Sequence, residues 1–255
     1  MNNLMPIVES TAIAPGVGDG APQLVLTLPR LIRSLAMLTF HTYFPGPGLE
    51  ERLAESTDAT LREIFQRAQQ LRALSGDDLP YWESIIVSSW STARLDMLID
   101  QALRHDVARE ANTRFDIRTN ELTPDRIRQA VACLAPGWVL ALCSRCEALD
   151  GSERHIPMMD FRCVPSPMNL ERTRIALKQL GQKRGAILES GRSYHYYGFE
   201  LQNRDQWIEF MARSLLLAPF VDARFIAHRL IEGTSVLRIT SSERKPRVPS
   251  VVAIL

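Results

Sequence analysis

Apolar residues in the first half of the chain recur every three or four positions, which is the spacing of one face of a helix. Residues 49–74 and 81–105 both show this pattern, and a Gly-Asp-Asp-Leu-Pro stretch separates them. We therefore expect a helical domain over residues 23–110. Residues 1–22 are rich in Gly, Pro and small side chains, which predicts a flexible arm.

The second half, residues 111–255, combines short apolar runs typical of strands with residues that cap helices. The expected strands cover residues 138–143 and 156–163, the two arms of a hairpin within 185–201, and 235–239. The expected helix starts are Thr123 before a proline, Asn169, and Asn203 with Gln206 three residues later. This mixture predicts an α+β fold with antiparallel hairpins flanked by helices.

Composition and charge exclude several classes of protein. The chain has 30 basic and 29 acidic residues, so the whole molecule has no strong field. Bases outnumber acids in residues 162–192 and 224–247. These segments could contact phosphate or could simply be solvated faces and loops. No apolar run is long enough to cross a membrane and no signal peptide is evident, so we expect a cytoplasmic protein.

Four cysteines raise the question of a zinc site, because Cys143 and Cys146 are spaced like a ligand pair. The remaining candidate ligands, Cys133, His155 and Cys163, lie at irregular distances and on apolar runs. Cys143 also follows an apolar run that is typical of a buried strand. Buried, unreactive thiols are the favoured interpretation.

Three polar islands interrupt the apolar pattern of the second half. In the first, Asp160 ends an apolar strand, where its side chain can reach solvent or a metal ion. In the second, Ser193 and His195 are two residues apart, so they share one face of a strand. Gly191 precedes them and would leave room for a ligand. In the third, Asp222 follows an apolar pair and is itself followed by basic residues.

These islands, in this order and spacing, resemble the three motifs of the archaeo-eukaryotic primase superfamily, including its primase–polymerase members. The family's first motif is an acid-x-acid pair, its second a Ser-x-His strand after a small-basic turn, and its third an apolar-Asp element followed by arginines and a lysine. The resemblance covers residues 135–248. It implies a primase-type, RRM-like core of antiparallel sheet with flanking helices, over residues 111–255.

The resemblance also implies roles for individual residues. Asp160 and Asp222 would hold Mg²⁺ or Mn²⁺ and, with His195, form the catalytic centre. The residues expected to bind the nucleotide are Arg192, Ser193, His195, Arg229, Arg238 and Lys245. The implied partners are nucleoside triphosphates and single-stranded DNA or RNA, with the helical half available to a protein partner. The implied activity is template-directed nucleotidyl transfer, as in primer synthesis, with a role in DNA replication or defence.

One departure from the family pattern leaves the activity open. Arg162 stands where the family has the second acid of the first motif. One like charge 4 Å from a metal ion costs about 4 kcal/mol at an effective dielectric constant of about 20. The site could bind nucleotide with Arg162 in place of one cation, react slowly with one ion, or serve binding alone in a catalytically degenerate scaffold. Alternatively, Arg162 turns away and Glu189 or Glu200 supplies the missing acid.

Each candidate residue also has an ordinary structural explanation. Asp160 could be a turn carboxylate, Asp222 could cap a helix, and His195 could be a hydrogen-bonded strand histidine. The tyrosines at 194, 196 and 197 could stack on bases, although some of them must face the core.

Overall fold

The computed structural model describes residues 15–45, 54–75, 81–89 and 113–255. Contacts divide the chain into two compact units, one of which lies within residues 45–110. Its described helices are α3 (Ala59–Ser75) and α4 (Tyr81–Ser89), so the helical prediction is confirmed for these residues. The other unit contains residues 15–44 and 113–255 and carries every candidate site residue.

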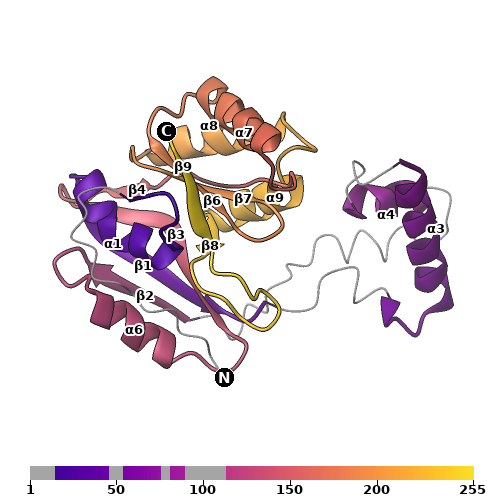
Figure 1. Ribbon diagram of the computed structural model, residues 1–255, viewed down its shortest axis with the longest axis horizontal. Coiled ribbons are helices and arrows are strands. Elements are labelled where there is room, and N and C mark those ends of the chain that lie inside the picture. The colour runs from indigo at the N-terminus through magenta and orange to yellow at the C-terminus, as the bar shows by residue number, and fades with distance from the viewer. Residues whose placement is uncertain (1–14, 46–53, 76–80, 90–112) are drawn as a thin grey trace. The chain divides into compact units, whose positions relative to one another are not determined.

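The larger unit is built on two antiparallel sheets (Figure 1). The first sheet consists of β2 (Thr113–Arg118), β1 (Leu35–Tyr43), β3 (Val139–Ala148) and β4 (Glu153–His155) in that order, with β8 (Val236–Arg238) also paired to β3. The second sheet has the order β5 (Met158–Asp160), β7 (Tyr194–Gly198), β6 (Gly185–Glu189) and β9 (Ser250–Ile254). The predicted α+β fold is confirmed.

Two hydrophobic clusters hold the unit together. One cluster joins the first sheet, α1 (Ala21–Leu31) and α6 (Pro124–Ala132) to one face of the second sheet, through Met158, Leu188 and Tyr197. The other cluster packs the opposite face of the second sheet against α7 (Pro167–Gln179), α8 (Arg204–Leu215) and α9 (Ala223–Glu232). Because strand residues alternate between faces, the second sheet is buried on both sides.

Helix starts follow the capping signals of the sequence in most places. The Thr123 side chain accepts the Arg126 N–H at the start of α6, and Asn203 with Gln206 forms the expected capping box of α8. The start of α7 differs from the prediction, because Ser166 rather than Asn169 is its cap. Pro167 after Ser166 explains the earlier start, since proline is favoured at the first helical position.

The prediction of helix throughout residues 23–110 is wrong at residues 35–43, which form β1. The strand contains register irregularities on both sides of Leu38. They break the two-residue alternation, so Leu35 and Leu38 are both buried although they are three residues apart. This spacing imitates a helix. As a result, β1 and α1 belong to the same unit as residues 113–255 rather than to the helical segment.

The expected flexible arm is ordered in its last residues. The Gly18 N–H donates to the Val251 carbonyl at 2.8 Å, and the Ala21 N–H donates to the Pro249 carbonyl at 2.7 Å. These bonds attach the start of α1 to β9, a strand that the sequence did not predict. Residues 1–14 of the predicted arm lie outside the described residues.

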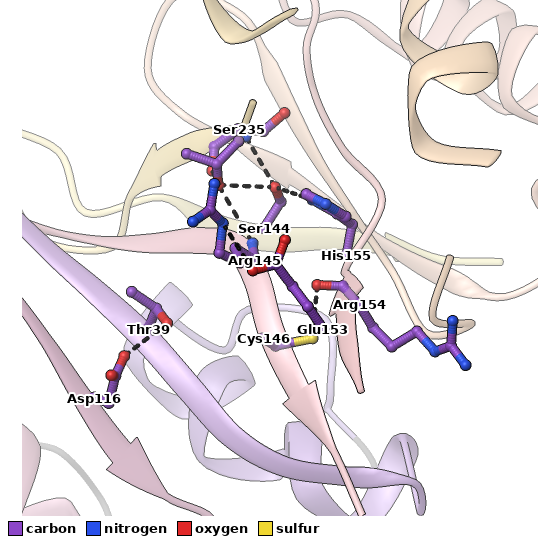
Figure 2. A network of polar contacts seen from close by, with 10 residues as sticks. Thr39, Asp116, Ser144, Arg145, Cys146, Glu153, Arg154, His155 and Ser235 are labelled. Carbon is purple, nitrogen blue, oxygen red and sulfur yellow. Dashed lines mark hydrogen bonds and ion pairs between the residues drawn. The ribbon is translucent and has the colours of Figure 1, made fainter. Parts of the chain in front are cut away.

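A buried polar network lies on β3 at the point where its pairing passes from β8 to β4. Ser144 lies between the β3 residues that pair with β8 and those that pair with β4. Its hydroxyl is 3.2 Å from His155 Nδ1 and 3.1 Å from Thr234 Oγ1, and it accepts the Ser235 N–H at 2.8 Å (Figure 2). The His155 ring also stacks on Trp207, so this network links the sheet to α8.

A search for membrane spans among the described helices finds none that is both long and apolar enough to cross a bilayer.

Candidate functional site

Two strands of the second sheet bring Asp160, Ser193 and His195 together. Asp160 ends β5 and pairs with His195 of β7. The Ser193 hydroxyl donates to Asp160 Oδ1 at 3.3 Å, and His195 Nε2 lies 3.8 Å from the same oxygen. The structure thus places Ser193 and His195 on one side of the strand, facing the acid of the first island.

Asp222 reaches the same place from the segment before α9. Val221 forms a bridge with Phe161, and the Asp222 N–H donates to the Asp160 carbonyl oxygen at 3.1 Å. The Asp222 side chain also accepts the Phe225 N–H at 2.9 Å and caps α9. The capping role and the place beside Asp160 are compatible, because a carboxylate has two oxygens with several acceptor sites.

The neighbouring Asp222 makes a negative charge on Asp160 less favourable. Burial and the neighbouring Asp222 raise the pKa of Asp160 to about 7, against the opposing effects of Lys245, the Ser193 hydrogen bond and Arg238. Two carboxylates in one partly buried site hold a proton or a cation more readily than two full negative charges. Near neutral pH, Asp160 can therefore both take up and release a proton.

His195 is neutral in this environment. Burial, followed by the charges of Arg238 and Lys245, holds the pKa of His195 well below its ordinary value. Its contact with Asp160 is therefore not a pair of full charges. Within the described part of the chain, His195 Nδ1 and the hydroxyl of Tyr197 are buried without a hydrogen-bond partner. A ligand or water reaching them would recover hydrogen bonds that the protein itself does not supply.

The turn between β6 and β7 shapes the rim of the site. Ser190 and Ser193 close it, with the Ser190 N–H donating to the Ser193 carbonyl at 2.9 Å and the two hydroxyls 3.2 Å apart. Gly191 has φ of 113°, which a residue with a side chain rarely adopts, so this turn depends on glycine. Arg192 is exposed at its tip. The predicted hairpin turn is confirmed.

Arg238 is buried and bound to three carbonyl groups. Its guanidinium donates to Thr240 O at 2.9 Å, to Arg247 O at 2.6 Å and to Ser190 O. It therefore connects β8 to the turn that carries Ser193. Its charge still acts on Asp160 and His195, although three of its five N–H donors are already engaged.

The other predicted cations lie in different settings. Arg229 is buried, forms an ion pair with Glu232 at 3.0 Å and lies over the Phe225 ring. Lys245 is exposed in a tight turn closed by two backbone bonds with Ser242, and its charge lowers the pKa of Asp160. The structure thus gathers the acids, Ser193 and His195, with Arg238 and Lys245 within electrostatic reach.

Sequence reasoning did not single out Tyr43 of β1, which lies close enough to the site for the charge of Asp160 to act on it. Burial raises the pKa of Tyr43, and the charges that act on it come from Arg238, Arg229 and Asp160. The phenol therefore lies near the two buried arginines and the candidate acid. The sequence does not indicate this, because the spacing of the buried residues in β1 imitates that of a helix.

Neither Glu189 nor Glu200 lies where it could replace the missing acid of the first motif. Glu189 pairs with Tyr194, whereas Asp160 pairs with His195, so Glu189 is on the opposite face of the sheet. Glu200 follows the far end of β7. Arg162 stays at the site end, where its N–H donates to Phe220 O at 3.0 Å and continues the antiparallel pairing beyond Asp160.

The proposed base-stacking tyrosines are core residues. Tyr194, Tyr196 and Tyr197 are all buried, and the Tyr194 hydroxyl bonds to the backbone of Ser166 at the start of α7. None of the three rings offers a free face to a base. That interpretation is wrong, because the second sheet is covered on both sides.

The donor set at the site suits one hard divalent ion. Asp160 and Asp222 are adjacent carboxylates, which such ions prefer. In the described residues, no group of three or more His, Cys, Asp or Glu side chains is arranged to hold a metal. Water and phosphate oxygens would have to complete the coordination, as is usual for Mg²⁺.

Burial raises the pKa of both Cys143 and Cys146 to about 12, so these thiols stay protonated, as expected for core cysteines.

Comparison with known proteins gives one positive result. The family model described as archaeo-eukaryotic primase 1D-like (AEP-like) matches residues 118–250, just over half of the chain. This range includes every candidate site residue from Asp160 to Lys245 and excludes β1 with Tyr43. No curated protein and no solved structure matches the chain.

Proposed function

The chain belongs to the archaeo-eukaryotic primase 1D-like family, and we propose that it binds a nucleoside triphosphate and single-stranded nucleic acid and performs slow, metal-dependent nucleotidyl transfer at Asp160 and Asp222. The family supports a primase-type function at the level of the superfamily. The nucleotide, the metal ion and the transfer reaction are our proposals.

The observation that carries the proposal is the coupled acid pair beside unpartnered hydrogen-bonding groups. Burial, followed by the charge of Asp222, raises the pKa of Asp160 to about 7. His195 Nδ1 is buried and lacks a partner among the described residues. A ligand bound beside the acid pair could supply the hydrogen bond that this nitrogen lacks.

The residues divide into two roles. Asp160 and Asp222 would hold one Mg²⁺ or Mn²⁺, which stabilises charge on the reacting phosphate. Ser193 and His195 would donate to phosphate oxygens, and Lys245 would balance their negative charge. In the transfer, the oxygen of the 3′ hydroxyl forms a bond to the α-phosphorus and gives up its proton to solvent water, and the bond from that phosphorus to the departing pyrophosphate breaks.

Arg162 favours a second candidate, in which the site binds nucleotide without reaction. Its backbone continues the strand that ends at Asp160, where the family has another acid. An arginine there replaces a metal-binding charge with a cation that can itself contact phosphate. Such a protein would act as a nucleic-acid-binding scaffold.

Extension of a labelled primer on a template, with Mn²⁺ and nucleoside triphosphates, tests the proposal. We expect weak extension by the wild type and none by Asp160→Ala or Asp222→Ala, because each removes a metal-binding carboxylate. Binding of a fluorescent nucleotide, measured in parallel, reports the site independently of transfer. Extension that persists in both variants would remove these acids from the mechanism.

Arg162→Glu separates the two candidates. If the site is intact apart from this charge, the variant should extend primers at least tenfold faster than the wild type, because it restores a metal-binding acid. Arg174→Glu, at an exposed position of α7, is the matched control with the same charge change. Nucleotide binding without extension in the wild type and in both variants would favour the scaffold.

A further inference from the structure

A pocket of about 430 Å³ lies between α6 and the first sheet, near the edge formed by β2 (Figure 1). Its walls come from the ends of β1 and β2, from α6 and from the segment that leads to β3. The volume falls within the range of about 300–1,000 Å³ that is usual for small-molecule sites. The pocket is therefore large enough to hold a ligand.

Two aromatic side chains contribute to the wall of the pocket. Phe115 stacks on its cross-strand partner Phe40, with ring centroids 5.6 Å apart. Phe115 and Trp138 line the pocket and are only half-buried, so part of each ring is open to it. The indole N–H of Trp138 makes no hydrogen bond with any described residue. Exposed aromatic rings bind nucleic-acid bases by stacking, whatever the base.

Arg126 gives the pocket a positive charge. Its guanidinium donates to the neutral Gln129 Oε1 at 3.0 Å and forms no ion pair with a described residue. Asp125, next to it on α6, is paired with Arg128. On β2, Asp116 alternates with Phe115 and therefore lies on the strand face turned away from the pocket. The open donors of Arg126 suit a phosphate oxygen.

The pocket is distinct from the Asp160–Asp222 site. The residues that line it include neither acid, and they include neither Ser193 nor His195. The charges that act on Asp160 are those of Asp222, Lys245 and Arg238, and that of Arg126 is not among them. A ligand in the pocket would thus leave the acid pair free.

We propose that the pocket binds one nucleotide of a single strand, with its base against Phe115 and Trp138 and its phosphate on Arg126. One guanidinium matches the single charge of a backbone phosphate, whereas a free phosphate monoester carries about 1.5–2 charges at neutral pH. The choice of a nucleotide, among aromatic anions, rests on the proposed function. The pocket itself requires no transfer at Asp160.

Cys133 lines the pocket and can report its occupancy. It is exposed, whereas Cys143 and Cys146 are buried and Cys163 is half-buried. The experiment measures the rate at which fluorescein maleimide labels Cys133, located by peptide mass spectrometry, over a range of concentrations of a short oligothymidylate. At about ten times the half-protecting concentration, labelling should be about tenfold slower than without the strand. No protection at any concentration would overturn the proposal.

Arg126→Ala tests the phosphate contact. Losing one charge-assisted hydrogen bond should raise the half-protecting concentration at least about tenfold, and Arg126→Lys should recover part of this loss. Arg128→Ala is the matched control, because Arg128 is also exposed on α6 but is paired with Asp125 and does not line the pocket. Thermal denaturation verifies folding. Equal half-protecting concentrations for Arg126→Ala and Arg128→Ala would contradict the proposed contact.

Two further arms separate this proposal from its alternatives. Thymidine monophosphate should protect Cys133 less well than the strand at the same concentration of nucleotide units, and equal protection would remove the strand from the proposal. Asp160→Ala should leave protection unchanged, and loss of protection would place the strand at the acid pair instead. Protection without primer extension under any metal would contradict transfer at Asp160 and support the pocket. Extension without protection would do the reverse.

Discussion

The larger unit contains two serine–histidine clusters, one buried and one half-buried, that differ in whether their polar atoms have hydrogen-bond partners. In the first sheet, Ser144 bonds to His155, Thr234 and the backbone of Ser235 (Figure 2). In the second sheet, the cluster of Ser193, His195 and Asp160 leaves His195 Nδ1 without a partner among the described residues.

This difference separates a structural cluster from a candidate site more clearly than residue type does. A buried donor or acceptor without a partner costs about 1–3 kcal/mol, so a folded protein seldom keeps one without a reason. The hydrogen bonds of the Ser144 hydroxyl join β3 to β4 and to the residues just before β8. The Ser193 cluster contains an acid with a raised pKa, and its His195 Nδ1 has no partner among the described residues.

Asp160→Asn should have the largest effect on stability. The pKa of Asp160 is raised from 3.8 to about 7, so the fold favours its protonated form, and this stabilisation is lost as the pH rises from about 4 to about 7. Asparagine does not ionise. The variant should therefore gain stability relative to the wild type over this range, by at most about 4 kcal/mol above pH 7.

Urea denaturation at a series of pH values measures this difference, with Asp205→Asn, an exposed acid of α8, as the control. A difference that does not change with pH would contradict the raised pKa. At pH 8, Mn²⁺ should raise the denaturation midpoint of the wild type but not that of Asp160→Asn, because only the wild type keeps both carboxylates.

Ser144→Ala should have the next largest effect, a loss of about 2–3 kcal/mol in the free energy of unfolding. The change leaves the Ser235 N–H and the His155 ring without their shared partner. Ser193→Ala removes the same atom from a half-buried position with weaker bonds and should cost less than about 1 kcal/mol. Equal losses in urea denaturation would erase the distinction between the two clusters.

His195→Phe should have the smallest effect on stability, within about 1 kcal/mol of the wild type, because Nδ1 has no partner among the described residues and Nε2 lies 3.8 Å from Asp160 Oδ1, beyond hydrogen-bonding distance. Nucleotide affinity, measured by fluorescence titration, should nevertheless fall. His155→Phe is the matched variant and should show the reverse, with lower stability and unchanged nucleotide affinity. A large loss of stability in His195→Phe would make this histidine structural.

The sequence predicted the parts of the fold that depend on short-range rules. Ser193 and His195 face Asp160 because residues two apart share a strand face. Asn203 caps α8 through a pattern contained within four residues. Such features need no knowledge of distant contacts.

The features that sequence reasoning missed depend on long-range contacts. Strand β1 is irregular because it pairs with β2 and β3, which follow it by many residues, so its own pattern resembles a helix. The same error concealed Tyr43. Arg238 was expected to bind phosphate, and its bonds to three carbonyl groups depend on where the chain folds after β8.

The pairing of β1 with β2 has a consequence for the evolution of the molecule. Thr42 and Thr113 are direct partners at the end of this pair, so the chain leaves the core and returns to it at two neighbouring points. Residues 45–110 therefore occupy the position of a hairpin loop. An insertion there costs little closure entropy and leaves every strand of the core in its place, so the helical segment could be gained, lost or exchanged as a module while the acid pair stays intact.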